Sequence, residues 1–202
     1  ITERSGGSRI FISFVKPGLM SEIDILAHLV LAPYIIKATA LISNERRVGG
    51  NQFRHAFATL GILLDYKYFS SSVLLKASLI HDLIEDKPET NLHELRSIDS
   101  DANRVVDLVL EVTRKECETK AAYLKNILKN GSYEAKILKV ADRISNLTDL
   151  HRDVYSEEKM MKYLDETEEY VIPMAKDVNH NMVTELTDLI KKRREMLQCV
   201  AS

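Results

Sequence analysis

The chain has 202 residues, of which 45% are hydrophobic and 29% are charged, and its formal net charge at pH 7 is −2. This length and hydrophobic content suffice for one substantial core, so a single domain is expected. The near-neutral charge gives no electrostatic case for a protein that coats nucleic acid or binds a membrane surface. Any phosphate group must therefore be bound by a few placed basic residues.

Cysteine use and hydropathy indicate a cytoplasmic protein. The two cysteines, Cys117 and Cys199, lie far apart and outside any CxxC or Cys/His cluster. A disulfide framework or a structural zinc site is therefore not expected, and a reducing cytoplasm fits. The longest apolar stretch, residues 26–42, is interrupted by polar residues and a proline and falls short of a membrane span.

The first 20 residues lack the charged and then apolar layout of a signal peptide. Met20 would make a plausible native start, with Ser21 as the cap of a helix. Residues 1–20 are therefore interpreted as an N-terminal extension or an expression remnant, and residues 21–202 as the folded domain.

Apolar residues recur at helical spacing along most of the chain, which contains only seven Gly and four Pro. This pattern predicts an all-α domain without strands, internal repeats or long linkers. Gly49 and Gly50 precede the third helix, Pro88 follows the fourth, and Ser132 caps the eighth. The helices are predicted at about 21–32, 34–44, 52–64, 72–85, 91–98, 102–113, 117–128, 133–149, 157–171 and 179–198.

The fourth predicted helix carries the densest group of chemically active side chains. His81 and Glu85 are four residues apart, as are Asp82 and Asp86, so each pair is predicted to stack on one side of the helix. Three carboxylates and an imidazole beside a buried apolar stripe are costly unless a partner compensates them. A divalent cation would do so, and mixed nitrogen and oxygen ligands favour manganese, iron, cobalt or zinc over calcium. The alternative is a solvated helix end with a chance His-Asp pair.

Two positions elsewhere complete a plausible coordination set. His55 lies near the start of the third predicted helix, where a capping or core histidine is the simpler interpretation of that residue alone. Asp142 lies in a strongly apolar helix in which an aspartate needs a partner, and Asn146 and Asp149 fall on the same helical face. A buried ion pair with an arginine is the alternative role for Asp142.

A histidine, then a His-Asp pair, then a distant aspartate resembles the metal-binding signature of the HD phosphohydrolase superfamily. The segments His-Asp-Leu-Ile-Glu-Asp at 81–86, Val-Thr at 112–113 and Lys-Val-Ala-Asp-Arg-Ile-Ser-Asn-Leu at 139–147 are similar to the hydrolase domain of the RelA/SpoT homologues. The resemblance spans about residues 38–171 and leaves no room for the synthetase domain of the long family members. The chain thus resembles the small, single-domain alarmone hydrolases, which implies one compact multi-helical HD-type domain.

The resemblance implies an activity and roles for the clustered residues. These relatives remove the 3′-pyrophosphate from the guanosine alarmones ppGpp and pppGpp, usually with one manganese ion as cofactor. By resemblance, Glu85 and Asp86 would be the catalytic acidic pair that orients the attacking water and moves its proton. The carried-over metal ligands would be His55, His81, Asp82 and Asp142.

Substrate contacts follow from the same resemblance and from charge. Arg47 is the first candidate to bind the pyrophosphate, because the planar guanidinium can bind two phosphate oxygens at once. The weaker candidates are Arg46, Lys139 and Arg143, with Asn146 near the nucleoside and Tyr163 close to the substrate. A solvated surface charge is the alternative for each cation, and a core position is the alternative for Tyr163. Residues 46–55 are shorter than in the family and lack its lysine and Pro-Tyr, so the resemblance constrains the reaction more than the nucleotide.

Two other functions stay open. One is an HD-type hydrolase of another nucleotide, including a phosphatase of a 2′- or 3′-phosphorylated dinucleotide. The other is a catalytically silent nucleotide-sensing module, against which the retained Glu85 and Asp86 argue. The oligomeric state and the metal used in the cell stay open as well. The remaining histidines are expected at the surface or in packing contacts: His28, His93, His151 and His180.

Overall fold

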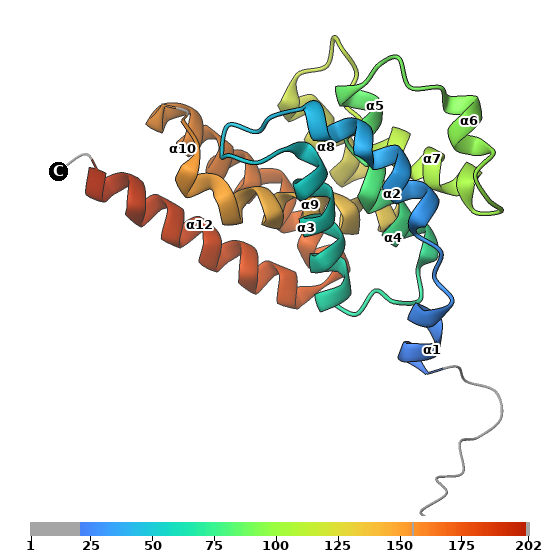
Figure 1. Ribbon diagram of the computed structural model, residues 1–202. Helices are drawn as coiled ribbons and strands as arrows, with labels where there is room; N and C mark the ends of the chain where they lie inside the picture. Colours follow the sequence, from blue (N-terminus) through green and yellow to red (C-terminus); the bar gives the residue numbers. More distant parts are fainter. Residues whose placement is uncertain (1–20, 155, 201–202) are drawn as a thin grey trace, which may run out of the picture.

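The computed structural model describes residues 21–154 and 156–200, which form one all-α assembly of packed helices (Figure 1). The predicted fold class is confirmed, and the β contact found in this part of the chain is an isolated bridge between Glu45 and Asn51. In chain order the elements are α1 (Glu22–Ala27), α2 (Ala32–Ala38), η1 (Thr39–Ser43), α3 (Gln52–Asp65), α4 (Ser72–Ile80), α5 (Leu83–Asp86), α6 (Leu92–Arg96), α7 (Ala102–Val112), α8 (Lys120–Asn130), α9 (Tyr133–Asp149), η2 (Leu150–Arg152), α10 (Glu157–Glu166), the π-helical η3 (Thr167–Val171), α11 (Ile172–Val178) and α12 (His180–Val200).

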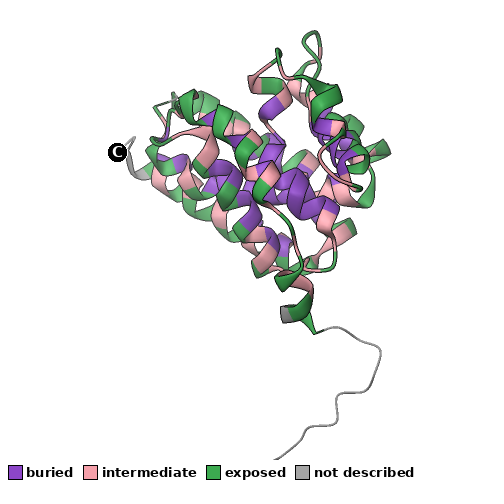
Figure 2. Cartoon of the chain, turned by 45° about the vertical axis from the view of Figure 1, so that its right-hand side comes forward, coloured by how far each residue is buried: buried purple, intermediate pink, exposed green. Residues whose placement is uncertain are grey.

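Helices α4 and α9 form the centre of the fold. Helix α9 packs against α3, α7, α11 and α12, and α4 packs against α2, α3 and α7. Every residue of α4 from Val73 to Ile80 is buried, and α9 buries side chains such as Leu138, Ala141 and Ile144 at helical spacing. Figure 2 shows this buried centre enclosed by exposed faces of the outer helices. Functional side chains on these two helices are therefore held by the core itself.

Several predicted helix boundaries are wrong, and local hydrogen bonding explains them. The helix predicted at 21–32 ends at Ala27, and the chain restarts as α2 with Pro33 in its first turn. The helix predicted at 117–128 begins only at Lys120, because the side chain of Thr119 caps it by accepting from the backbone N–H of Ala122. The helix predicted at 157–171 continues through the π-helix η3 into α11.

The helix predicted at 72–85 is broken at the His-Asp pair. Helix α4 ends at Ile80, His81 and Asp82 form a turn, and α5 begins at Leu83. Nδ1 of His81 donates to the carbonyl of Ser78 at 2.8 Å, and so uses an acceptor that the next helical turn would need. The prediction of one continuous helix through these four groups is therefore wrong, although Asp82 and Asp86 share one helical turn, in which the backbone N–H of Asp86 donates to the carbonyl of Asp82 at 2.9 Å.

No helix in the described part of the chain is long and apolar enough to cross a lipid bilayer. The four histidines predicted at the surface or in packing contacts are exposed. Residues 1–20, interpreted above as an extension, lie outside the described residues, so that interpretation and the proposed boundary at residue 21 stay proposals.

Candidate active site

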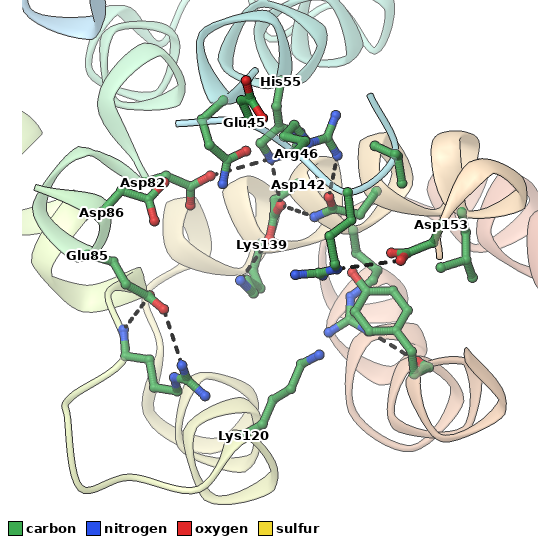
Figure 3. Close-up of a pocket in the computed structure, with 18 of the residues that line it drawn as sticks. Glu45, Arg46, His55, Asp82, Glu85, Asp86, Lys120, Lys139, Asp142 and Asp153 are labelled. Atoms are coloured by element: carbon green, nitrogen blue, oxygen red, sulfur yellow. Dashed lines mark hydrogen bonds and ion pairs between the residues drawn. The ribbon is translucent and has the colours of Figure 1, made fainter. Parts of the chain in front are cut away.

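The four predicted metal ligands converge from three parts of the core (Figure 3). His55 lies in the first turn of α3, His81 and Asp82 follow α4, and Asp142 lies in the middle of α9. Nε2 of His55 is 3.0 Å from Oδ1 of Asp142 and 3.6 Å from Oδ2 of Asp82. Nε2 of His81 is 3.3 Å from Oδ2 of Asp82 and 3.9 Å from Oδ1 of Asp142. Two imidazole nitrogens and two carboxylate oxygens thus surround one small volume.

The opposite ring nitrogens hold both imidazoles in place. Nδ1 of His55 is 2.9 Å from the hydroxyl of Ser145, and Nδ1 of His81 donates to the carbonyl of Ser78. The ligand atoms of His55, His81 and Asp82 lie within 4.8 Å of one another, and Asp142 lies beside the two imidazoles. The bond to Ser78 turns Nε2 of His81 toward the carboxylates, and the atom is buried without a hydrogen-bond partner among the described residues. A buried imidazole nitrogen of this kind beside two carboxylates fits a divalent cation, and the two-histidine, two-aspartate donor set suits a transition metal.

Strong electrostatic coupling accompanies this geometry. Burial alone would lower the pKa of His81, but Asp82 and Asp142 raise it to about 9. Burial would raise the pKa of Asp142, but Lys139, whose Nζ is 2.7 Å from Oδ2, holds it well below its usual range together with His55 and His81. Asp142 therefore stays ionised, and the carboxylates attract positive charge to the point that the imidazoles face.

Glu85 and Asp86, the predicted catalytic pair, lie beside this group on α5 (Figure 3). Glu85 is 40% exposed at its side chain, and its Oε2 accepts from the backbone N–H of Arg114 at 3.3 Å. Oδ2 of Asp86 is buried without a hydrogen-bond partner in the described chain, and burial together with Asp82 raises the pKa of this carboxyl. The two carboxyl groups therefore occupy different environments, as a pair that divides water activation and proton transfer requires.

These groups open onto a cavity of about 500 Å³, a size typical of small-molecule sites. Its lining contains six cationic and six acidic side chains. All six predicted substrate contacts are among the lining residues, which are Glu45, Arg46, Arg47, Val48, Gln52, His55, Asp82, Glu85, Asp86, Arg114, Lys120, Tyr123, Lys139, Asp142, Arg143, Asn146, Leu150, Asp153 and Tyr163.

The predicted cations differ sharply in exposure. The side chain of Arg47 is 55% exposed at the cavity edge, with Nε 3.5 Å from Oδ1 of Asp153. Arg46 is only 8% exposed and bonds to α9, and Lys139 is 16% exposed against Asp142. All three cations lie near acidic side chains, but only Arg47 among them has the exposure of a phosphate contact.

Tyr163 lies half-buried between two cations. The guanidinium carbon of Arg143 is 4.0 Å from the ring centroid and Nζ of Lys120 is 4.1 Å from it. Arg143 is buried, and its Nη1 donates to the carbonyl of Tyr163 at 3.2 Å and to the hydroxyl of Thr167 at 2.7 Å. Arg143 therefore supports Tyr163 from the core, while Lys120 extends toward the cavity (Figure 3).

Arg114 and Lys120, which were not predicted from the sequence, flank the segment between α7 and α8 and line the cavity. Burial and the nearby Arg143 lower the pKa of Lys120 to about 8. The segment 114–120 contains three cations and two acids and is indistinguishable from an ordinary solvated charge run. Its position directly after the Val-Thr pair at 112–113 was the available signal.

Comparisons with known proteins agree with this fold. No protein-family model matches the chain. The human guanosine-3′,5′-bis(diphosphate) 3′-pyrophosphohydrolase MESH1 is 28% identical over 150 residues, which are 72% of this chain and 82% of the human protein. The solved structure of a metazoan ortholog of SpoT, a protein said to hydrolyse ppGpp and to act in starvation responses, superposes with a TM-score of 0.70 at 22% identity. That match covers 81% of this chain and 94% of the ortholog.

The chain is thus similar in sequence to the human hydrolase and shares the all-helical fold of the SpoT ortholog, and acidic side chains and His55 line its polar cavity. The predicted resemblance to the small HD-type alarmone hydrolases is confirmed by the homology to MESH1 and by the structural match.

Proposed function

We propose that this protein is a metal-dependent hydrolase that removes the 3′-pyrophosphate of ppGpp and pppGpp, leaving GDP and GTP, and that it acts in the cytoplasm. The observation that supports this proposal is the buried Nε2 of His81, which faces two carboxylates without a hydrogen-bond partner in the described chain. His81 lies in the turn before α5, the helix that carries Glu85 and Asp86. The activity named for the human relative MESH1 supports the choice of substrate.

Manganese is the proposed cofactor, held by His55, His81, Asp82 and Asp142. When bound, it would lower the pKa of a coordinated water and polarise the phosphoryl group. It would also change the charge balance of the cavity, because six cationic and six acidic side chains cancel and a divalent ion makes the whole positive. A cavity with that balance suits a substrate that carries several phosphate charges.

The chain's own residues would share the remaining tasks. Glu85, which lines the cavity, would orient the attacking water and accept its proton, and Asp86, whose pKa is raised by burial and Asp82, would return a proton to the leaving O3′. Water would add to the phosphorus on O3′, the P–O3′ bond would break, O3′ would leave as the nucleotide's hydroxyl, and the two phosphoryl groups with the added oxygen would be released as pyrophosphate. Arg47 and Lys120 are proposed to bind phosphate oxygens, and Tyr163 to pack against the nucleoside.

The test is product analysis by anion-exchange chromatography, with purified protein, ppGpp, and either manganese or a chelator. We expect GDP and pyrophosphate in a manganese-dependent reaction, with little action on GTP or simple phosphate monoesters. Glu85→Gln is the matched control, because it should bind manganese normally while turnover falls by about 10²- to 10⁴-fold.

Other outcomes would identify the alternatives. Rapid turnover of an adenine nucleotide beside inert ppGpp would replace the alarmone assignment by another HD-type hydrolase. Tight binding of ppGpp without any turnover would indicate a nucleotide-sensing module. Loss of manganese from Glu85→Gln would mean that Glu85 is a ligand and not the proposed base.

A further inference from the structure

Arg46 joins two polar residues of α9 in the described structure. Its Nη1 is 3.0 Å from Oδ2 of Asp149, and its Nη2 donates to Oδ1 of Asn146 at 2.9 Å. Only 8% of the Arg46 side chain is exposed, and both partners lie about 100 positions away in the sequence. The guanidinium therefore uses two separate nitrogens on two partners, and a bound phosphate would have to compete with both of them.

Asn146 continues this connection to the predicted metal ligand. Its Nδ2 donates to Oδ1 of Asp142 at 2.6 Å. Because its Oδ1 accepts from Arg46 and its Nδ2 donates to a carboxylate, the orientation of the amide is fixed at both ends. The side chain that the family resemblance assigns to the nucleoside thus has both ends engaged.

The oxygen that Asn146 contacts is the one that faces the imidazoles. Oδ1 of Asp142 is 3.0 Å from Nε2 of His55, whereas its Oδ2 is bonded to Lys139 at 2.7 Å. A carboxylate oxygen has two lone-pair directions, so Oδ1 can accept from Asn146 in one and face a cation in the other. Asn146 and Lys139 together fix the rotation of this carboxylate.

Arg47 provides a contrast within the same loop. Its side chain is 55% exposed at the cavity edge, and its Nε is 3.5 Å from Oδ1 of Asp153. The loop turns tightly at Gly49 and Gly50, which both have positive φ angles, and the backbone of Arg46 bonds to both of these glycines. This turn holds Arg46 toward α9.

We propose that Arg46 and Asn146 are positioning residues, which act in series on Asp142 and so connect the loop 44–51 to the metal site. The inference rests on the metal site of the proposed function and assigns these residues a different role from the substrate contacts that the resemblance implies. Hydrogen-bonding partners of metal ligands typically contribute 10- to 100-fold to metal affinity.

The test is calorimetric titration of metal-free full-length protein with Mn²⁺. Arg46→Ala and Asn146→Ala should each weaken manganese binding by about 10- to 100-fold. The double variant should bind no more than about two- to three-fold more weakly than Asn146→Ala, because residues acting in series are not additive. Arg46→Lys should fail to restore affinity, because one ammonium cannot span Asp149 and Asn146 in the same way. Arg47→Ala is the matched control and should bind manganese like the unsubstituted protein.

Melting curves of the metal-free variants separate positioning from folding. If Arg46→Ala and Asn146→Ala lower the melting temperature but bind manganese normally, the two residues are structural and the inference is overturned. Additive losses in the double variant would overturn the series arrangement. If the unsubstituted protein does not bind manganese, the metal site of the proposed function fails together with the inference.

Discussion

Lys76 on α4 and Lys139 on α9 each form an ion pair with aspartates in the described chain, and the two clusters differ in whether nearby buried polar groups lack a partner. Nζ of Lys76 on α4 is 2.8 Å from Asp99 and 2.7 Å from Asp101, with 7% of its side chain exposed. Nζ of Lys139 on α9 is 2.7 Å from Asp142, with 16% of its side chain exposed. Both clusters join residues of a core helix to oppositely charged neighbours.

The Lys76 cluster is closed. The hydroxyl of Tyr34 donates to Oδ1 of Asp99 at 2.9 Å, and the hydroxyl of Ser72 donates to Oδ2 of Asp101 at 2.7 Å. None of these side chains is among the buried groups without a partner in the described chain. These hydrogen bonds and ion pairs connect the segment between α6 and α7 to α2 and α4. The geometry of the network is that of a structural ion-pair cluster.

The Lys139 cluster is open. Next to Asp142 it leaves Nε2 of His81 buried without a partner, and nearby Oδ2 of Asp86 is in the same condition among the described residues. It also borders the 500 Å³ cavity, which the Lys76 cluster does not. A buried polar group without a hydrogen-bond partner costs free energy of folding. Such a group beside a cavity is therefore typical of a site that binds an ion or a ligand.

The largest expected effect is in the open cluster. His81→Ala and Asp82→Ala each remove a proposed manganese ligand, so metal content and turnover should both be lost. Turnover should fall by more than about 10²-fold, because even the outer partners of ligands contribute 10- to 100-fold. The measurements are bound manganese by elemental analysis and rate, on the same preparations. Full metal content in both variants would contradict the ligand assignment.

The closed cluster should show the opposite pattern. Lys76→Met leaves Asp99 and Asp101 without their cation, and should lower the free energy of unfolding by about 3 kcal/mol. Manganese affinity of the folded variant should not change, because Lys76 does not line the cavity. Urea denaturation and manganese titration of the same sample measure the two quantities. A variant that loses metal but keeps its stability would reverse the comparison between the clusters.

The pH dependence of unfolding gives an independent check on Lys76. Lys76 and Ser72 lower the pKa of Asp101, and the pKa of Asp99 is also lowered because Lys76 and Tyr34 outweigh its burial. A carboxyl group with a lowered folded-state pKa stabilises the fold above its unfolded pKa, near pH 4, and this contribution disappears on acidification. The stability of Lys76→Met should therefore fall less between pH 5 and pH 3 than that of the unsubstituted protein.

The two clusters also show which buried charged groups can be predicted from the sequence and which cannot. The open cluster was predicted because His81, Asp82 and Asp142 interrupt strongly apolar helical segments, where a charge or imidazole is anomalous. Lys76 lies in an equally apolar segment and was not noticed, because a lone lysine at one helical position is usually solvated. Its partners Asp99 and Asp101 reach it only through the packing of α7 on α4.

Contacts that depend on tertiary packing were also missed within the candidate active site. The helical periodicity predicted that Asn146 and Asp149 share a face with Asp142, and these three residues do lie along one connected path. It could not predict that Arg46 would join them, because that contact depends on how the loop 44–51 folds across α9. The break at His81 was missed because it depends on a side-chain bond to Ser78 and not on residue type or spacing.

The smallest expected effect concerns Lys120. This lysine lies at the cavity edge, in contrast to the buried lysine of the closed cluster. Its pKa is lowered to about 8 by burial and Arg143, so the free enzyme loses this positive charge as the pH rises through 8. If Lys120 binds a phosphate, kcat/KM should fall by up to about ten-fold between pH 7 and pH 9.5. Lys120→Arg keeps its charge over this range and should flatten that decline, whereas Lys120→Ala should raise KM about ten-fold at pH 7. The measurement is kcat/KM against pH for all three proteins at saturating manganese, and an identical alkaline decline in Lys120→Arg would assign the titration to another group.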